Sequence, residues 1–501
     1  MDFVMILNMS LEDIREARLE KLDKLKKAGI DPYQAKSLRT HGIAQVVADF
    51  DKLAEEKQSL VLAGRVMAKR EQGGLAFVDI DDGSASLTRS GSGKIQLLFK
   101  KDDIGEKSFD MFSQTVDIGD FIEASGTLFK TKREEKTLAV TDYKILTKSL
   151  LPLPEKWHGL EDVEEKLRRR YLDLIMDPKV KELFIKKSVF WQATREFLLN
   201  EGGLEVETPI LERIPGGADA EPFKTHMNAL GIDLYLRIAP ELNLKRLSVG
   251  GFEKVFEIGR IFRNEGIDRE HLQDYTQMEM YWAYADYEEL MKTVERLVKH
   301  VVHRTLGSYS HPYQGKTIDW YADWKKIDYF EVFKKYTGLS LAEVSEKDLK
   351  KYAENEKINI EKHMGRGRLI DVIFKKKVRA HLIEPGFLIL PPVDIEPLAK
   401  RYSADPSRVE RFQIVACGSE LGKGFSELND PIDQRERFEE QVKLGKAGDK
   451  EAQRMDEDFV EALEYGMPPT AGFAYSERLF AFIMNKPVRE TAFFPLMKPR
   501  S

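Results

Sequence analysis

The chain has 501 residues, of which 42% are hydrophobic and 33% charged, and its formal net charge is −6 at pH 7. This composition supports folded cores, and the length suits about two or three domains. The net charge excludes a uniformly basic nucleic-acid coat, although it leaves a local basic face open.

Cysteine and hydropathy patterns narrow the class of protein. Cys417 is the single cysteine, which excludes an internal disulfide and any zinc site built from several thiolates. Such cysteine usage is typical of a reducing compartment. No stretch approaches the roughly 18 apolar residues of a membrane helix. We therefore expect a cytoplasmic protein with no membrane association.

The first predicted element is an N-terminal helix. Ser10 and Asp13 have the spacing of a helix cap, and apolar residues recur at helical spacing through Leu25, before Gly29. The other face, within residues 15–27, carries lysines and arginines that interleaved acidic residues nearly balance. Both a solvated face and a face that contacts phosphate are consistent with this pattern.

A group of short β runs follows. They are Leu60–Ala68, Leu75–Ile80, Lys94–Phe99, Phe121–Lys130 and Thr137–Leu146. Five such strands with glycine-rich turns predict a small closed barrel of the OB type. The second and third strands of these barrels commonly present side chains to single-stranded bases. Phe77 and Gln96 are the candidates, with a place in the barrel core as the alternative for Phe77.

Proline pairs and charge mark the domain organisation. The prolines in Leu151–Pro154 end the barrel unit, and a charged helix is predicted over Glu161–Tyr171, including the arginines at 168–170. We expect an N-terminal helix and barrel in residues 1–150 and a linker in 151–178. The remaining residues, 179–501, form one large α+β domain with a charged helical insertion around 331–380.

Two neighbouring predicted strands in the large domain contain the polar and charged residues of a candidate site. Val255–Glu265 alternates as a strand, so that Arg263 and Glu265 project from one face. In the returning strand, Thr276–Ala283, one face is formed by Thr276, Met278, Met280 and Trp282. This face is mainly apolar, so it must pack against a core. Gln277, Glu279 and Tyr281 line the opposite face, where a carboxylate needs a partner. The alternative is an ordinary amphipathic sheet with a surface Glu–Arg pair.

Two later runs favour a nucleotide site. Gly422–Asp430 places Phe425 and Glu427 on one face of a strand. Gly466–Phe480 is a Pro/Gly stretch that enters an apolar helix and delivers Arg478 near its start, where the helix dipole and a guanidinium suit polyphosphate. No Walker or Rossmann sequence is present, so a nucleotide site must be built from arginines on strands.

Taken in order, these segments resemble the three signature motifs of class II aminoacyl-tRNA synthetases. The first is the helix–strand Phe190–Leu211, the second is the FRNE segment with its returning strand, and the third ends at Arg478. Within that class the chain is similar to the lysyl-tRNA synthetase family from about Ile14 to Pro499. The segments that carry most weight are AGRVMAKR (63–70), LPEKWHGL (153–160), RRYLDLI (169–175), PGGADAEPF (215–223), YLRIAPEL (235–242) and GFSELND (424–430).

The resemblance implies a fold, a reaction and partners. The fold is α+β: a five-stranded OB-type barrel, then a large class II domain with a mainly antiparallel sheet flanked by helices. The reaction joins L-lysine to tRNA(Lys) through a lysyl-adenylate formed from ATP, with Mg²⁺. Motif 1 implies a homodimer. No catalytic base is expected, because the substrate carboxylate itself attacks the α-phosphorus and the protein supplies positioning and charge.

The resemblance also implies site residues. The ATP residues are Arg263, Glu265, His271, Tyr275, Glu420 and Arg478, of which Arg263 and Arg478 are catalytic through phosphate contact. The lysine residues are Gly216, Gly217, Glu241, Glu279, Tyr281, Phe425 and Glu427. The anticodon residues are Phe77, Gln96 and Glu135. The metal residues are Glu420 and Glu427.

Several departures qualify this resemblance. Gln413 stands where the family has a metal-binding Glu, Lys423 stands where it has Asn, the segment ending at Arg478 is one residue shorter, and Gly83–Gly93 is longer. We hypothesise that Lys423 partly replaces a Mg²⁺ ion near the phosphates, so that fewer ions bind. A lysine that points away is the alternative.

The departures leave a competing function open. Gln413, Lys423 and the short third motif suit a catalytically weakened, synthetase-like protein that binds RNA or regulates. A third reading is the truncated relative that lysylates a translation factor. That relative lacks the barrel, so the β runs between Leu60 and Leu146 oppose this reading.

Overall fold

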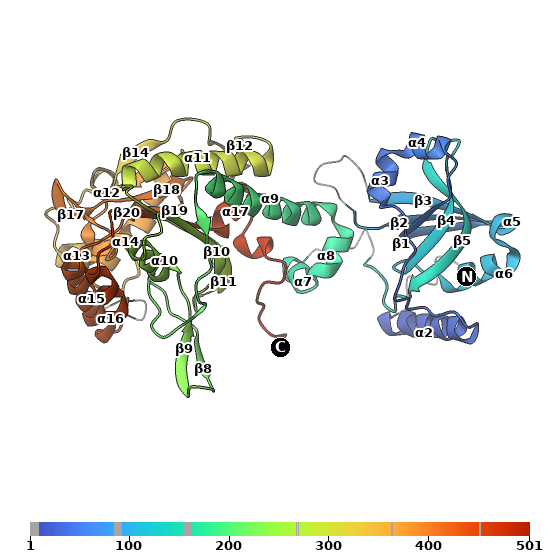
Figure 1. Ribbon diagram of the computed structural model, residues 1–501, viewed down its shortest axis with the longest axis horizontal. Coiled ribbons are helices and arrows are strands. Elements are labelled where there is room, and N and C mark those ends of the chain that lie inside the picture. Colours follow the sequence, from blue (N-terminus) through green and yellow to red (C-terminus); the bar gives the residue numbers. More distant parts are fainter. Residues whose placement is uncertain are drawn as a thin grey trace. The chain divides into compact units, whose positions relative to one another are not determined.

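The computed structural model describes residues 10–84, 93–154, 162–266, 268, 270–361, 364–449 and 452–500. The chain divides into two compact units, Met1–Asp162 and Val163–Ser501. Figure 1 shows the first in blue to cyan and the second in green to red.

The first unit is built around a closed five-stranded barrel, with strand order β1-β2-β3-β5-β4. Its strands are β1 (Leu60–Gln72), β2 (Leu75–Asp81), β3 (Lys94–Lys100), β4 (Phe121–Lys130) and β5 (Lys136–Thr147). Its helices are α2 (Leu11–Lys27), α3 (Ile43–Ala48), α4 (Phe50–Glu55), α5 (Lys101–Ile104) and α6 (Glu106–Thr115). Alternate apolar side chains fill the barrel, among them Leu62, Val78 and Leu97. The OB-type prediction is confirmed. Of the long Gly83–Gly93 connection, residues 85–92 lie outside the described residues.

Helix α2 begins as predicted, with a capping box in which Ser10 and Asp13 bond to each other's backbone. Its basic face is not wholly exposed. Arg18 is buried, and its guanidinium donates to the backbone oxygens of Ile118, Ser149 and Leu151. Arg18 is therefore neither exposed to solvent nor placed to contact a phosphate, which were the two alternatives for this face of the helix.

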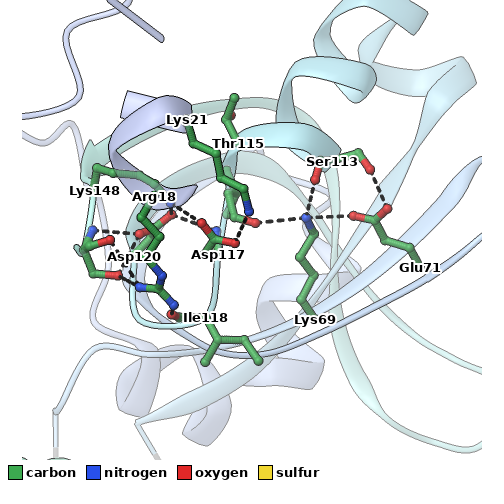
Figure 2. A network of polar contacts seen from close by, with 12 residues as sticks. Arg18, Lys21, Lys69, Glu71, Ser113, Thr115, Asp117, Ile118, Asp120 and Lys148 are labelled. Atoms are coloured by element: carbon green, nitrogen blue, oxygen red, sulfur yellow. Dashed lines mark hydrogen bonds and ion pairs between the residues drawn. The ribbon is translucent and has the colours of Figure 1, made fainter. Parts of the chain in front are cut away.

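A buried network of charges joins this helix to the barrel (Figure 2). Lys148 Nζ lies 2.6 Å from Asp117 Oδ2 and 2.7 Å from Asp120 Oδ2. Lys21 of α2 reaches the other oxygen of Asp117 at 2.5 Å. Since two ammonium groups meet two carboxylates, the cluster is compensated within itself.

The second unit is built on an eight-stranded sheet of order β14-β15-β18-β19-β20-β11-β10-β6. Neighbours are antiparallel except at the pairs β14–β15 and β10–β6, which confirms the mainly antiparallel prediction. The sheet strands are β6 (Leu204–Glu205), β10 (Lys254–Phe262), β11 (Asp274–Ala283), β14 (Lys325–Asp328), β15 (Gly386–Ile389), β18 (Arg411–Ala416), β19 (Ser419–Ser426) and β20 (Thr470–Ser476). Smaller sheets contain β7 (Leu211–Glu212), β8 (Lys224–Met227), β9 (Ile232–Leu236), β12 (Ser310–Tyr313), β13 (Lys316–Asp319), β16 (Arg401–Tyr402) and β17 (Asp405–Val409).

Helices surround this sheet. They are α7 (Val163–Arg168), α8 (Arg170–Met176), α9 (Pro178–Asn200), α10 (Glu241–Val249), α11 (Tyr287–Leu306), α12 (Tyr329–Thr337), α13 (Glu346–Asn355), α14 (Arg366–Lys377), α15 (Pro431–Lys446), α16 (Glu457–Glu464) and α17 (Glu477–Ile483). Figure 1 shows α9 and α11 running along one side of the sheet. Their apolar residues share the main core with Met278, Met280 and Trp282 of β11. The opposite face of β11 is therefore the one free to form a site.

The charged region around 331–380 is helical, as expected. It contains α12, α13 and α14, which pack around Phe333, Ile370 and Phe374 in a core of their own. Leu388 and Val415 of the large sheet join that core, so the insertion is seated on one end of the sheet.

Several local predictions need correction. The expected helix through Tyr171 is divided at Arg169 into α7 and α8, and Arg170 is buried against Asp173. Strand β10 ends at Phe262, so Arg263 follows it, although pairing continues through the Arg263 N–H to the Gln273 carbonyl at 2.8 Å. The stretch before Arg478, predicted to run directly into a helix, contains strand β20.

Within the described part of the chain, no helix has the length and apolar composition needed to cross a membrane.

Candidate functional site

Strand register aligns the candidate residues across the free face of the sheet. Residues directly opposite one another share a face, and one such row contains Glu257, Glu279, Ala474, Lys423 and Gln413, on β10, β11, β20, β19 and β18 in that order. The next row contains Tyr281, Gly472, Phe425 and Arg411. Because β20 contributes only small side chains here, the larger side chains of β11 and β19 stand on either side of it, and we call the strip of residues between them the trough.

The trough requires glycine on its floor. A Cβ atom at Gly472 would lie 2.3 Å from Glu427 Oε1 and 2.4 Å from Tyr281 Cε1, both far inside van der Waals contact. Any side chain would therefore displace the two walls. Gly472 thus lets Tyr281 and Glu427 pack directly against the backbone of β20.

The β11 wall presents an acidic group. Glu279 is 2% exposed, and its carboxylate accepts hydrogen bonds from Gln277 Nε2 and, at 3.0 Å, from the Tyr281 hydroxyl. Burial, together with the negative charge of Glu241, raises the pKa of Glu279 to about 7. No cation forms an ion pair with Glu279 among the described residues, so the wall offers an acceptor for one.

Two more acidic residues, Glu241 and Glu427, lie at one end of the trough. Lys245 of α10 is fully buried, and its Nζ lies 2.7 Å from Glu241 Oε1 and in direct contact with Glu427 Oε2. Burial raises the pKa of both carboxyls. Burial lowers the pKa of Lys245, but the two carboxylates outweigh that effect and raise it. Glu427 Oε1, which faces Gly472, has no hydrogen-bond partner in the described structure.

Gly216 and Gly217 pack against the start of α10. A Cβ atom at Gly217 would lie 2.7 Å from Glu241 Cβ, and one at Gly216 would lie 2.5 Å from Leu242 Cδ1. Gly217 also has a positive φ of 82°, which favours glycine. The loop can therefore approach Glu241 closely, as expected for the α-amino end of a bound amino acid.

Cationic residues gather at the other end of the trough. Arg263 donates from Nε to the Ile238 carbonyl at 3.3 Å, and its guanidinium carbon lies 5.7 Å from the centre of the Tyr275 ring. Burial lowers the pKa of Arg263, but the surrounding groups, Tyr275 and Glu265 first among them, outweigh it and raise it. The guanidinium therefore stays charged beside an aromatic face.

Arg478 reaches the same end despite the shortened third motif. It is the second residue of α17, which Ser476 caps. Its Nη2 lies 3.1 Å from His271 Nε2, and its Nη1 donates to the Glu420 carbonyl at 3.4 Å. His271 Nδ1 lies 2.7 Å from Asp268 Oδ2, which favours an Nδ1–H tautomer with Nε2 facing Arg478. The second-motif loop, the third motif and β19 thus converge.

The residues at the expected metal position offer few ligands. Gln413 Oε1 accepts from Arg411 Nη2 at 2.9 Å, and Glu427 is held by Lys245, which leaves Glu420. No group of three His, Cys, Asp or Glu side chains is arranged to hold an ion within the described residues. The site fits a Mg²⁺ ion that takes one carboxylate from the protein and its other ligands from phosphate and water, a common arrangement for this ion. Lys245 holds Glu427 Oε2, while Glu427 Oε1 has no hydrogen-bond partner in the described structure.

Lys423 does not point away from the site. Its Nζ lies 2.9 Å from Glu396 Oε2, which also lies 3.4 Å from Arg411 Nε. Burial raises the pKa of Glu396, but Lys423 and Arg411 outweigh it, so that the pKa falls below the usual range. The single negative charge of Glu396 thus pairs with two cations, Lys423 and Arg411, so that this group has one more positive than negative charge.

The barrel presents the three predicted anticodon residues separately from its core. Phe77 is half-buried on the outer face of β2, and the barrel core does not include it, so the alternative of a core aromatic is wrong. Gln96 stands on β3 opposite Asp79, which lies two residues along β2 from Phe77 and on the same face. The Thr137 hydroxyl lies 3.2 Å from Gln96 Oε1 and 3.1 Å from the Glu135 carbonyl and can donate to either. The three positions therefore share one patch.

Sequence reasoning missed two residues of the trough. Lys245 follows Glu241 by four positions, a helical ion-pair spacing that could have revealed it. Glu396 follows a short 3₁₀ turn, Val393–Ile395, and no local pattern marks it, because its partners stand on distant strands.

Comparison with known proteins agrees with this geometry. The family model described as tRNA synthetases class II (D, K and N) matches residues 162–498, and the model described as OB-fold nucleic acid binding domain matches residues 60–146. The lysine–tRNA ligase of Carboxydothermus hydrogenoformans is 44% identical over 98% of this chain and 99% of its own length. Those of Roseiflexus castenholzii and Bacillus subtilis are 45% and 44% identical over 98% of this chain, and over 100% and 98% of their own lengths. The chain therefore belongs to the class II (D, K and N) tRNA synthetases, among the lysine–tRNA ligases.

Proposed function

We propose that this chain ligates L-lysine to tRNA(Lys) in two steps. The lysine carboxylate attacks the α-phosphorus of ATP and pyrophosphate leaves, which gives lysyl-adenylate. A hydroxyl of the terminal tRNA ribose then attacks the carbonyl carbon, and AMP leaves. The observation that carries the proposal is the trough itself, with carboxylates at one end and Arg263, His271 and Arg478 at the other.

The residues act by binding and by charge. Glu279, Tyr281 and Glu427 Oε1 receive the ε-ammonium, Phe425 flanks the aliphatic stem, and Glu241 with Gly216 and Gly217 receives the α-amino group. An apolar or anionic side chain would leave buried carboxylates unpaired, which selects strongly for a cation.

At the nucleotide end, Arg263 holds the α-phosphate, Arg478 and His271 hold the outer phosphates, Tyr275 stacks on adenine and Glu265 contacts its edge. Such positioning, together with preorganised charge, is the main source of catalysis in phosphoryl-group chemistry.

ATP–pyrophosphate exchange tests this proposal directly. Lysine should drive exchange in the full chain, and aspartate or asparagine should not. Arg263→Ala should lower exchange by about 100- to 1,000-fold, as the loss of one preorganised charge contact does elsewhere. Exchange driven by aspartate, or exchange that survives Arg263→Ala, would overturn the assignment. The competing RNA-binding or regulatory function predicts no exchange, and no feature of the described structure favours it.

We also propose that fewer Mg²⁺ ions bind here than in other members of the family. A bound ion would be held by Glu420 and would neutralise phosphate charge. The Glu396 cluster, with its excess positive charge from Lys423 and Arg411, supplies part of the same neutralisation. ATP binding to the wild type should depend weakly on Mg²⁺ in calorimetry, and Lys423→Asn should increase that dependence. The exposed Lys446→Asn is the control, and an unchanged Mg²⁺ dependence in Lys423→Asn would reject the idea.

We further propose a homodimer formed through the first motif. Four large apolar side chains at the end of α9 and in the segment that follows it are each between 42 and 50% exposed. They are Leu199, Leu204, Ile210 and Leu211. Large apolar side chains concentrated in this way are typical of an interface. Light scattering should give a dimer mass, and Leu204→Glu with Leu211→Glu should give a monomer, whereas Ile432→Glu on α15 should not.

The remaining partners follow from the same assignment. We propose that Phe77, Gln96 and Glu135 read the tRNA anticodon and that the protein works in the cytoplasm, where the single thiol of Cys417 stays reduced.

A further inference from the structure

Arg237 is a buried arginine for which the proposed reaction has no direct use. Its side chain is 2% exposed, and it stands directly after β9, in the short segment that leads into α10. Burying a guanidinium is unfavourable unless its charge is paired and its N–H groups are hydrogen-bonded. The groups to which Arg237 bonds therefore show what it holds in place.

A carboxylate and a threonine anchor the guanidinium. Arg237 Nη1 forms an ion pair with Glu257 Oε1 and lies 3.1 Å from the Thr208 hydroxyl. Glu257 Oε2 accepts from the Thr208 N–H at 3.1 Å and from the Thr208 hydroxyl at 2.7 Å. Glu257 stands opposite Glu279 in the strand pair. Because both of its oxygens are engaged in this way, it is not a further carboxylate for the substrate.

Gly259 of β10 gives the guanidinium its space. A Cβ atom at this position would lie 2.2 Å from Arg237 Nη2 and 2.8 Å from Glu257 Oε1. Any side chain there would therefore push the guanidinium away from its partners.

The same arginine ties the end of β10 to the segment at Ile238. Arg237 Nε donates to the Arg260 carbonyl at 2.9 Å, and the Arg237 carbonyl accepts from the Phe262 N–H at 3.1 Å. Phe262 is followed directly by Arg263. The Ile238 carbonyl, one residue beyond Arg237, accepts from Arg263 Nε at 3.3 Å. Arg237 thus bonds to the backbone on both sides of the contact between Arg263 and Ile238.

We propose that Arg237 is a positioning residue that fixes the guanidinium of Arg263 for the α-phosphate of ATP, an inference that rests on the proposed function. The Ile238 carbonyl takes only Nε of Arg263. No hydrogen bond joins the two terminal nitrogens of Arg263 to a described residue, so this planar fork is available to phosphate oxygens. If the Ile238 carbonyl shifted, the fork would shift with it, and a displacement of about 1 Å can lower a rate about 100-fold.

A double-mutant cycle between Arg237 and Arg263 in the full chain tests this proposal. Arg237→Lys keeps the charge but loses the fork, so kcat/KM for ATP in lysine-driven exchange should fall about 10- to 100-fold. In an Arg263→Ala background the same substitution should change kcat/KM by less than about twofold, because Arg237 acts through Arg263. No effect in the wild-type background, or equal effects in both backgrounds, would overturn the inference.

Arg170→Lys is the matched control. Arg170 is 4% exposed, forms an ion pair with Asp173 at 2.7 Å and donates to the backbone carbonyls of Glu490 and Ala492. Urea unfolding should show a similar loss of stability in Arg170→Lys and Arg237→Lys, whereas kcat/KM for ATP should stay close to wild type in Arg170→Lys. An equal fall of kcat/KM in both would mean that Arg237 is merely structural.

Glu257→Gln keeps the test decisive if Arg237→Lys does not fold. It removes the charge that pairs with Arg237 and keeps the shape of the side chain, so kcat/KM for ATP should fall less, and again only while Arg263 is present. A fall that persists in Arg263→Ala would overturn the inference. Calorimetry of ATP binding without lysine gives the same cycle independently of exchange, and exchange by the wild type with lysine tests the proposed function separately.

Discussion

Among the described residues, each unit contains one lysine whose side chain is fully buried, and the two lysines differ in what surrounds them. In the barrel unit, Lys148 meets Asp117 and Asp120, and Lys21 adds a second ammonium (Figure 2). In the catalytic unit, Lys245 meets two carboxylates and Glu279 remains without a cation. In the first cluster each carboxylate has an ion-paired ammonium, whereas the second has more carboxyl groups than ion-paired cations, so it can accept a cationic ligand.

The same difference appears in the acidity of the two clusters. Burial raises the pKa of Asp117, but Lys148 and Lys21 outweigh it, so the pKa falls below the usual range. Burial and the negative charge of Glu241 raise the pKa of Glu279 to about 7, and the hydrogen bonds from Tyr281 and Gln277 and the charge of Arg263 only partly oppose this rise. A buried charge cluster is thus structural when it is compensated and marks a binding site when it is not.

The largest effect is expected in the compensated cluster. Lys148→Met leaves Asp117 and Asp120 buried with one ammonium between them, and breaking such a pair costs about 3–5 kcal/mol. Amide hydrogen exchange in β1–β5 under urea should show that loss, while lysine-dependent ATP–pyrophosphate exchange below the transition stays unchanged. The exposed Lys52→Met should change stability by less than about 0.5 kcal/mol. A similarly small effect of Lys148→Met would contradict the comparison.

The uncompensated cluster should behave in the opposite way. Glu279→Gln removes an acceptor for the substrate ammonium, so the KM for lysine should rise about 10- to 100-fold. Stability should hold or increase, because a buried carboxylate without a cation is itself unfavourable. Lysine titration of the exchange reaction and urea unfolding give the two readouts, with the exposed Glu253→Gln as control. A clear loss of stability would show that Glu279 is structural after all.

The fold could be predicted where local pattern and tertiary packing agree. The five strands of the barrel, the capping box at Ser10 and the division of β11 into two faces all follow from periods of two or 3.6 residues. Strand β20 was missed because prolines and glycines obscure its alternation, and its pairing with β11 and β19 is non-local. The break at Arg169 was missed because Arg170 is buried by partners more than 300 residues away.

The site was predictable where one residue type carries the chemistry. Arg263, Glu279 and Arg478 stand in recognisable segments, and the structure gathers them along one trough. Lys245 and Glu396 are different, because a lysine and a glutamate are ordinary on any helix or loop. Their roles arise from burial and from the strands opposite them, which no single segment encodes.

The outer face of the barrel provides a contrast with its buried cluster. Phe77→Ala removes an aromatic surface on which a base can stack, a contact worth about 1–3 kcal/mol in other proteins. The KM for tRNA(Lys) in aminoacylation should rise accordingly, while exchange without tRNA and the stability of the barrel stay close to wild type. Leu75→Ala, on the same face of β2, is the control. Equal effects of both variants would mean that stacking at Phe77 is not used.

The smallest expected effect is the pH dependence of stability, which has opposite signs for Glu279 and for Asp117. The pKa of Glu279 is raised from 4.5 to about 7, so the folded protein holds a proton that the unfolded chain has lost. This contribution to stability therefore declines as the pH rises from about 4.5 to about 7. Lysine needs the ionised carboxylate, so its KM should fall by at most about tenfold per pH unit up to about pH 7 and then level off.

The contribution of Asp117 to stability changes with pH in the opposite direction. Its lowered pKa gives stability that is fully present above the ordinary value of 3.8 and is lost only as the pH falls further. Between pH 6 and 8 the barrel should therefore keep its stability while the KM for lysine changes. Glu279→Gln should flatten most of the lysine profile, and the remaining slope would belong to Glu241 and Glu427, whose pKa values are raised in the same direction. A profile that Glu279→Gln leaves intact would assign the titration near pH 7 to that pair, because the pKa of Asp117 is lowered and Asp117 therefore stays ionised there.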